Sequence, residues 1–247
     1  MLLKDKVCIV TGAGKGFGEE IAKEFYAQGA KLALITRSQK DIDNLMVKFD
    51  SERVLSVCGD VSDGSTVSQF ISQTINEFGV IDVLVNNAGM RFRKEFLDIG
   101  NDELDQVLNV NLKSVVSLCQ EVLPHMVKNN GGKIINMSSI AGTLGFSDLS
   151  GYVMSKAAII GLTKSLAVEF AGKNIQINTL APGFCKTSYF EKFQENTELY
   201  DFTLSRIPMN RWGSSKEVAD VCVFLASNMS NYMTGEVLKV DGGWSAG

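Results

Sequence analysis

Tyr152 and Lys156 lie four residues apart in SGYVMSKAAIIG (150–161), a segment whose small and apolar residues favour a helix. Residues with this spacing share one helix face, so the phenol and the ammonium can meet. A phenol has a pKa near ~10 and transfers protons poorly at neutral pH, but a nearby cation favours its ionised form. We therefore expect Lys156 to lower the pKa of Tyr152 and to prepare it for proton transfer.

Two serines stand thirteen and fourteen residues before that tyrosine. Ser138 and Ser139 follow the apolar run KIINM (133–137), at the carboxyl end of a predicted strand. In an open α/β sheet, ligands sit beyond the carboxyl ends of the strands. A serine hydroxyl at this edge can hold a carbonyl oxygen beside the phenol.

A glycine-rich loop follows the first apolar run. The sequence TGAGKGFG places Gly12, Gly16 and Gly18 in a turn and in the first turn of the next helix. Glycine is needed where the backbone has positive φ or approaches a pyrophosphate, and a helix N-terminus offers free N–H groups. The spacing fits TGxxxGxG and not GxGxxG. A turn without a ligand is also compatible with this stretch taken alone.

The residues after the second predicted strand bear on which nicotinamide nucleotide is bound. That strand ends at Thr36, and Arg37 occupies the place where an acidic residue would bind the adenosine ribose. An arginine there can pair with a 2′-phosphate, and Lys15 in the glycine loop adds a second positive charge. The sequence favours NADP(H). NAD(H) stays open, because both cations are also compatible with solvated surface positions.

The elements that must position these groups alternate along the chain. Short apolar runs rich in β-branched residues predict buried strands, and the segments between them have helical spacing. Strands of this kind joined by helices form a parallel sheet covered on both faces. We predict an α/β fold with one Rossmann-type domain over residues 1–247, its doubly wound seven-stranded parallel sheet flanked by helices. The predicted strands are 6–10, 31–36, 53–57, 81–85, 133–137, 175–180 and 236–240.

Composition excludes several classes of protein. The chain of 247 residues is 45% hydrophobic and 21% charged, without a run of roughly 20 apolar residues, so we expect no membrane insertion. Its net charge of −4 argues against nucleic acid as the main partner. Five scattered cysteines and the single histidine, His125, give no metal-binding pattern. The N-terminus lacks a secretory signal, and we expect a cytoplasmic protein.

The order of these motifs resembles the classical short-chain dehydrogenase/reductase family over essentially the whole chain. The resemblance is carried by TGAGKGFG, GDVSD, NNAG, NVNLKS, IINMSSIAG, YVMSK, INTLAPGFCKT and GEVLKVDGG. It implies that Tyr152 exchanges the hydroxyl proton, Ser139 holds the reacting oxygen, and Lys156 binds the nicotinamide ribose. It also implies that Asn111 holds a water that links Lys156 to solvent.

The resemblance further implies the residues that contact the cofactor. Asp60 and Val61 match the adenine pocket, and the segment after the sixth strand matches the nicotinamide end. The irregular stretch 183–212 is expected to act as a substrate-binding lid within the domain. The expected cofactor contacts are Gly12, Lys15, Gly16, Phe17, Gly18, Arg37, Asp60, Val61, Asn87, Ala88, Gly89, Tyr152, Lys156, Pro182, Gly183 and Thr187.

The sequence indicates the type of reaction more clearly than it indicates the substrate. The chain resembles both 3-oxoacyl-carrier-protein reductases and sugar-acid dehydrogenases. We favour a small keto or hydroxy acid or a sugar acid, because Asn130 stands at one expected basic position of an acyl-carrier docking patch. Arg91 and Phe184 are the candidate substrate contacts. Arg91 and its neighbour Arg93 can attract a carboxylate, or can be solvated loop charges.

Two further alternatives stay open at this stage. An acyl carrier protein remains a candidate partner beside a small-molecule carbonyl or alcohol substrate. A protein of another class, a non-catalytic regulator that binds NADP, would not need a tuned phenol. The resemblance also implies a homotetramer, and the long predicted helix around Tyr152 has apolar residues on more than one face.

Overall fold

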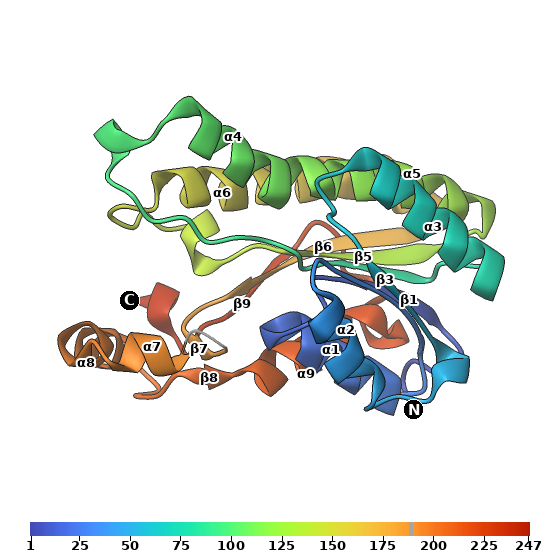
Figure 1. Ribbon diagram of the computed structural model, residues 1–247, viewed down its shortest axis with the longest axis horizontal. Coiled ribbons are helices and arrows are strands. Elements are labelled where there is room, and N and C mark those ends of the chain that lie inside the picture. The colour runs from blue at the N-terminus through green and yellow to red at the C-terminus, as the bar shows by residue number, and fades with distance from the viewer. Residues whose placement is uncertain (188–189) are drawn as a thin grey trace.

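The computed structural model describes residues 1–187 and 190–247 and contains one large sheet of seven parallel strands (Figure 1). The predicted α/β fold is confirmed, and the seven strands lie within two residues of the expected bounds. From one edge to the other, the order is β3 (Val54–Cys58), β2 (Lys31–Thr36), β1 (Val7–Thr11), β4 (Val83–Asn86), β5 (Gly132–Met137), β6 (Ile175–Pro182) and β9 (Val237–Val240).

The strand order reverses between β1 and β4. From β1 the chain builds outward to β2 and β3, and then returns to pair β4 with the other side of β1. The loops after β1 and β4 therefore leave the sheet in opposite directions and open a crevice at its carboxyl edge. This switch point is where the fold positions the glycine loop.

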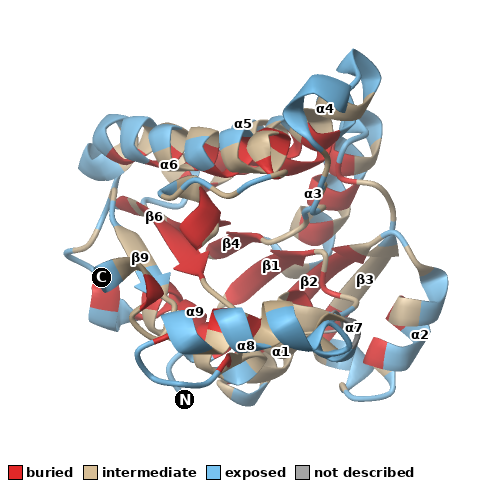
Figure 2. Cartoon of the chain, turned by 90° about the vertical axis from the view of Figure 1, so that its left-hand side faces the viewer, coloured by how far each residue is buried: buried red, intermediate tan, exposed pale blue. Residues whose placement is uncertain are grey.

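Helices cover both faces of the sheet, because its inner strands are apolar on both sides (Figures 1 and 2). In β1, Cys8 and Val10 pack into the core beneath α1, whereas Ile9 packs into the core on the opposite face. One layer holds α1 (Gly16–Ala27), α2 (Gln39–Met46) and α9 (Ser215–Ala226), and the other holds α3 (Gly64–Phe78), α4 (Asn101–Leu108), α5 (Ser114–Lys128) and α6 (Ser150–Phe170).

Two buried hydrogen bonds fix α6 on β5. Asn136 Nδ2 donates to Thr163 Oγ1 at 2.9 Å, and Ser138 Oγ donates to the carbonyl oxygen of Lys156 at 2.8 Å. Lys156 and Thr163 are seven residues apart, so both lie on the helix face toward the sheet. Sliding α6 along β5 would break both bonds inside the core, where unmade hydrogen bonds are costly.

A compact excursion separates β6 from α9 and includes most of the segment expected at 183–212. It contains β7 (Cys185–Lys186), α7 (Phe190–Gln194), α8 (Thr197–Arg206) and β8 (Gly213–Ser214). The pairing of β7 with β8 was not predicted, because two-residue strands carry no periodicity. Residues 188 and 189 of this segment lie outside the described residues. None of the described helices has the length and apolar character needed to cross a membrane.

Lys133 is a buried cation in β5 that offers a test of this core. It is 6% exposed and donates to Ser230 Oγ at 3.0 Å, and burial, with repulsion from Lys6, lowers its pKa to about 8. Because an unfolded lysine titrates near ~10.4, the unfolded chain binds more protons between these two values. The free energy of unfolding therefore rises with pH from about 8 to 10.

We expect Lys133→Met to raise the free energy of unfolding at pH 7 by about 1 kcal/mol, because it removes a poorly compensated charge. This change corresponds to a rise in melting temperature of roughly 2–4 °C. Differential scanning calorimetry at pH 7 and pH 10 measures the change, and the gain shrinks at pH 10. Lys164→Met, at an exposed position of α6, is the matched control and gives no such gain. A variant that melts below the native protein at pH 7 contradicts this account.

Candidate active site

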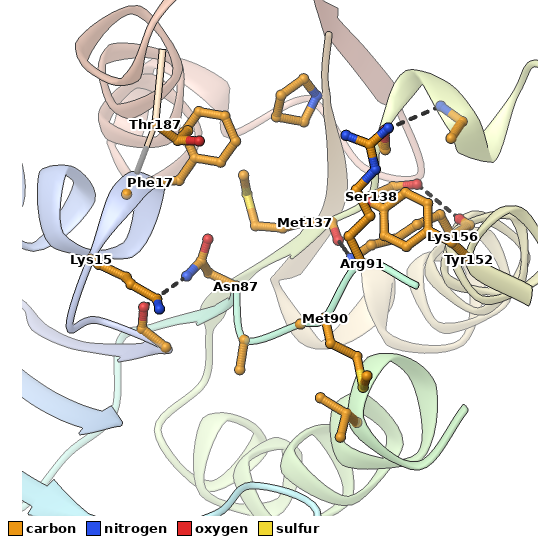
Figure 3. Close-up of a pocket in the computed structure, with 18 of the residues that line it drawn as sticks. Lys15, Phe17, Asn87, Met90, Arg91, Met137, Ser138, Tyr152, Lys156 and Thr187 are labelled. Carbon is orange, nitrogen blue, oxygen red and sulfur yellow. Dashed lines mark hydrogen bonds between the residues drawn. The ribbon is translucent and has the colours of Figure 1, made fainter. Parts of the chain in front are cut away.

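A cavity of about 380 Å³ opens at the carboxyl edge of the sheet and runs from the glycine loop to Tyr152 (Figure 3). It brings together residues that were singled out in seven separate parts of the sequence. The expected site residues on its walls are Gly12, Lys15, Gly16, Phe17, Arg37, Asp60, Val61, Asn87, Ala88, Gly89, Arg91, Ser139, Tyr152, Lys156, Pro182, Gly183, Phe184 and Thr187.

Two expected residues stand behind the walls. Gly18 lies against the carbonyl of Gly12 and the side-chain amide of Asn87, so a side chain at this position would collide with both. Asn111 is fully buried in a π-helical turn, Asn109–Lys113. Such turns are rare and occur frequently at functional sites.

Asn111 is held by three hydrogen bonds of its side chain. Its Oδ1 accepts from Met90 N at 2.8 Å, and its Nδ2 donates to Met90 O at 2.9 Å and to Ser155 Oγ at 3.0 Å. The amide thereby fixes the backbone after Gly89, which lies between Asn111 and Lys156. The water expected at Asn111 stays a prediction, and the side chain visibly acts as a brace for the loop after β4.

The loops after β1 and β4 are tied to each other. Thr11 Oγ1 accepts from Asn87 N at 3.0 Å and from Ala88 N at 2.9 Å, while Asn87 Nδ2 donates to the carbonyls of Thr11 and Gly12 at 2.9 and 3.2 Å. Figure 3 shows the amide of Asn87 turned toward the glycine loop. These bonds hold the crevice in shape before any ligand enters.

The glycine loop has the geometry of a phosphate cradle. Gly12 and Gly16 have φ of +64° and +60°, in the left-handed region that favours glycine. A Cβ at Gly16 would meet only Thr187, at 3.7 Å, so its backbone faces open space at the start of α1. The free N–H groups and the dipole at a helix N-terminus suit a pyrophosphate. The residues present therefore fit a dinucleotide.

The end of β2 carries the charges that bear on the cofactor. Arg37 is mostly exposed and its Nη1 lies 3.8 Å from Asp60 Oδ2, a loose ion pair that contributes little in water. Arg37 is thus able to turn toward a ligand phosphate. The structure also brings the carboxylate of Asp41, at the start of α2, against Gly14 and Thr36. Sequence reasoning did not single out this acid, because it lies beyond the end of β2.

Tyr152 and Lys156 face the same end of the cavity (Figure 3). The Lys156 ammonium is buried, donates to the carbonyl oxygen of Met137 at 2.8 Å, and lies 5.8 Å from the centre of the Tyr152 ring. Burial lowers the pKa of Lys156 to about 8. The spacing argument is right about the shared face.

The expected direction of the tyrosine shift differs from the structure. Burial raises the pKa of Tyr152, and the influences that oppose this rise are the hydrogen-bonding Ser139 side chain and the charge of Arg91. The ammonium of Lys156 is directed at Met137 instead. Helical spacing could not reveal this result, because it says nothing about how deeply the phenol is buried.

The two serines have separate roles. Ser138 is buried and its hydroxyl is used by the backbone of Lys156, whereas Ser139 adopts an extended conformation, accepts from Ala141 N at 3.2 Å and faces Tyr152. Ser139 is therefore the hydroxyl that can reach a ligand oxygen together with the phenol.

Arg91 and Arg93 also differ. Arg93 pairs with Asp148 at 3.4 Å, whereas Arg91 makes no ion pair with any described residue and lines the cavity. Arg91 keeps solvent-accessible surface, yet the surrounding protein desolvates it enough to lower its pKa. An arginine so shifted is still a cation at neutral pH.

Sequence reasoning missed part of the cavity wall. The missed residues are mostly apolar or glycine, and nothing in their type marks them as site residues. They are Gly14, Ile35, Thr36, Gly59, Met90, Val110, Met137, Ile140, Ala141, Phe146 and Leu149.

Comparison with known proteins agrees with this geometry. A family model described as enoyl-(acyl carrier protein) reductase matches residues 12–245. The 3-oxoacyl-[acyl-carrier-protein] reductase FabG of Thermotoga maritima is 39% identical over 245 residues, covering 98% of this chain and 99% of that protein. The 2-dehydro-3-deoxy-D-gluconate 5-dehydrogenase of Dickeya dadantii is 34% identical over 245 residues, covering 99% and 97%.

A solved structure is similar over nearly its whole length. The crystal structure of a gluconate 5-dehydrogenase from Burkholderia cenocepacia in complex with NADP and tartrate has a TM-score of 0.94 and 31% identity, covering 99% of this chain and 97% of that one. The chain belongs to the short-chain dehydrogenase/reductase family and is an oxidoreductase that acts on CH–OH donors. The alternative of a non-catalytic regulator is set aside on this ground.

Replacement of Gly12 by alanine tests the cradle. The new Cβ would lie 2.9 Å from Ala88 Cα on a backbone with positive φ, so the two tied loops must separate. We expect Gly12→Ala to weaken nicotinamide nucleotide binding at least about tenfold, because strained backbone of this kind costs roughly 1–3 kcal/mol. Titration calorimetry with NADP⁺ measures the affinity.

Gly64→Ala is the matched control for this variant. Gly64 starts α3, and a Cβ there meets nothing within 4 Å. We expect its affinity for the nucleotide to equal that of the native protein. Equal affinity in Gly12→Ala as well would show that the loop geometry does not matter.

Proposed function

We propose that this protein is an NADP(H)-dependent oxidoreductase that interconverts a ketone and a secondary alcohol, with a small keto or hydroxy acid or a sugar acid as substrate. The observation that carries the proposal is the position of Tyr152, Ser139 and Lys156 at one end of a cavity whose other end is the phosphate cradle. A dinucleotide laid along the cavity directs its nicotinamide toward these three side chains.

The protein's own groups have distinct parts in the reaction. Ser139 and the Tyr152 hydroxyl hold the carbonyl oxygen, and Tyr152 donates its proton to that oxygen. The bound cofactor supplies the hydride that adds to the carbonyl carbon. Burial raises the pKa of Tyr152, so at neutral pH the phenol carries the proton that ketone reduction requires.

Lys156 and Asn111 support this arrangement. The buried ammonium of Lys156 has donors beyond the one used by Met137 O, and these can reach ribose hydroxyls. Asn111 braces the neighbouring loop, and the water expected at that residue would renew the proton on Tyr152 through Lys156. Gly183, Phe184 and Thr187, at the base of the segment 183–212, line the cavity, which supports a lid role for that segment.

The preference for NADP(H) rests on two exposed cations at the adenosine end, Arg37 and Lys15. A 2′-phosphate offers charge-assisted hydrogen bonds that a bare ribose hydroxyl does not. The structurally similar gluconate 5-dehydrogenase was solved with NADP, which supports the same choice here. NAD(H) is the alternative, and Asp41, which lies against Gly14 of the loop, is an acid that could favour it.

A second candidate function is 3-oxoacyl-[acyl-carrier-protein] reduction, with an acyl carrier protein as partner. It is supported by the relative of that name at 39% identity. Asn130 still stands at an expected basic docking position, between Lys128 and the glycine-rich turn before β5. We therefore rank this function second to a small-molecule acid.

We further propose a cytoplasmic homotetramer. The support is that α6, which is packed on the sheet along one face, also exposes apolar side chains on another. Met154 is 43% and Val168 is 84% exposed in the isolated chain. Apolar residues presented in this way suit a contact with a second copy.

Replacement of Tyr152 by phenylalanine tests the proposed chemistry. We expect Tyr152→Phe to lower the rate of NADPH-dependent ketone reduction by roughly 10²–10⁴-fold, because the proton donor is lost. NADPH binding, followed by the fluorescence of the reduced nicotinamide, should remain. Tyr232→Phe, at a fully exposed tyrosine, is the control and should keep native activity. An active Tyr152→Phe enzyme would refute the mechanism.

Reversal of the charge at Arg37 tests the choice of cofactor. We expect Arg37→Asp to lower the preference for NADPH over NADH by roughly 10–100-fold, the worth of a charged hydrogen bond. The ratio of kcat/KM with the two cofactors measures it. Lys40→Asp makes the same charge change at an exposed position of α2 away from the cavity and should leave the ratio unchanged. If Arg37→Asp still prefers NADPH, the assignment is wrong.

A further inference from the structure

A second, smaller cavity of about 160 Å³ adjoins the first beneath α8. The two cavities share four wall residues and are therefore adjacent. An apolar cavity of about 150 Å³ is large enough for a benzene ring. The shared residues are Arg91, Phe146, Leu149 and Phe184.

The walls of this second cavity are mainly apolar and include several aromatic rings that pack against one another. The ring of Trp244 lies 4.7 Å from that of Phe184 and 6.4 Å from that of Phe146, centre to centre. Asp241 fixes the turn that carries Trp244 by accepting from Gly243 N at 2.9 Å and Ser245 N at 3.0 Å. An apolar group entering here meets preformed walls.

The polar groups of this cavity are largely occupied. The hydroxyl of Thr203 donates to Tyr200 O at 2.7 Å and accepts from Trp212 Nε1 at 3.0 Å. Arg93 is paired with Asp148. A polyhydroxylated chain placed here would leave most of its hydroxyls without partners, and each unpaired buried hydroxyl costs affinity.

Arg91 stands where the two cavities join, on the loop after β4. Its neighbours on that loop are neutralised, since Arg93 pairs with Asp148 and Lys94 lies 2.7 Å from Glu103 Oε2. Within residues 1–187 and 190–247, Arg91 has no such partner. A guanidinium matches the planar geometry of a carboxylate and can bind it through two hydrogen bonds.

We propose that the substrate is an oxo acid with an apolar arm. Its carboxylate pairs with Arg91, its carbonyl oxygen lies at Ser139 and Tyr152, and its arm fills the aromatic cavity. The inference rests on the proposed function and narrows it, because it excludes sugar acids, whose hydroxyls the aromatic walls cannot pair.

A binding experiment tests the proposal without turnover. The chain has two tryptophans, Trp212 and Trp244, and both belong to the aromatic cluster around this cavity. We expect 4-phenylbutanoate, added to the protein with saturating NADP⁺, to change the tryptophan fluorescence. The neutral 4-phenylbutanol should bind at least tenfold more weakly, and gluconate should not change the signal.

Matched variants identify the anion site. Arg91→Met should weaken 4-phenylbutanoate binding at least tenfold while leaving 4-phenylbutanol binding comparatively unaffected. Lys94→Met removes the same charge from the same loop outside both cavities and should bind as the native protein does. If Arg91→Met binds the carboxylate as tightly as the native protein, or if gluconate binds as well as 4-phenylbutanoate, the proposal is overturned.

Steady-state kinetics with NADPH provide a second, independent test of the proposal. The native enzyme should reduce 2-oxo-4-phenylbutanoate with a higher kcat/KM than 4-phenyl-2-butanone, 5-oxogluconate or an acetoacetyl thioester. Arg91→Met should lower the preference for the acid over the neutral ketone at least tenfold, a change of ratio that a merely structural role would not produce.

The outcomes separate this inference from the proposed function. If no ketone is reduced, or if Tyr152→Phe remains active, the proposed chemistry fails while the fluorescence titration still decides the binding question. If hydride transfer depends on Tyr152 but the thioester or 5-oxogluconate is preferred, the chemistry stands and the apolar oxo acid is refuted.

Discussion

The active site depends on one buried contact, the ammonium of Lys156 donating to the backbone carbonyl of Met137. A cation in the core is expensive, and it persists only where its position is enforced. Here the hydrogen bonds of Ser138 and Asn136 to α6 hold the helix against the end of β5. The same bonds determine where Tyr152, one turn earlier, presents its hydroxyl. The packing of α6 against the end of β5 thus aligns the reacting groups.

Burial affects the pKa of Tyr152 more than any neighbouring charge does. The Tyr152 phenol is driven toward its neutral form by desolvation, and Arg91 works against that effect. A carboxylate bound to Arg91 would reduce this opposition and leave the phenol more firmly protonated. A carboxylate bound to Arg91 and the protonation of Tyr152 would therefore be coupled through one guanidinium.

Much of this arrangement could be predicted from the sequence, and the rest had no signal there. The strands were found because runs such as 31–36 are apolar on both faces, and the phosphate loop because its glycines are spaced for a tight turn. Helical spacing does not show how deeply a side chain is buried, so the pKa shift of Tyr152 was expected in the wrong direction. Phe146 and Leu149 were missed because apolar residues look alike wherever they pack.

The short pairing of β7 with β8 brings the chain back to where it left the sheet, with Cys185 opposite Gly213. The stretch between them is therefore bracketed, and its two ends are fixed independently of what lies inside. The β7–β8 pairing fixes both ends of this stretch, and Thr187 within it also lies beside Gly16 of the glycine loop. If this stretch selects the substrate, as proposed above, substitutions inside it would change specificity while the seven-stranded sheet keeps its strand order.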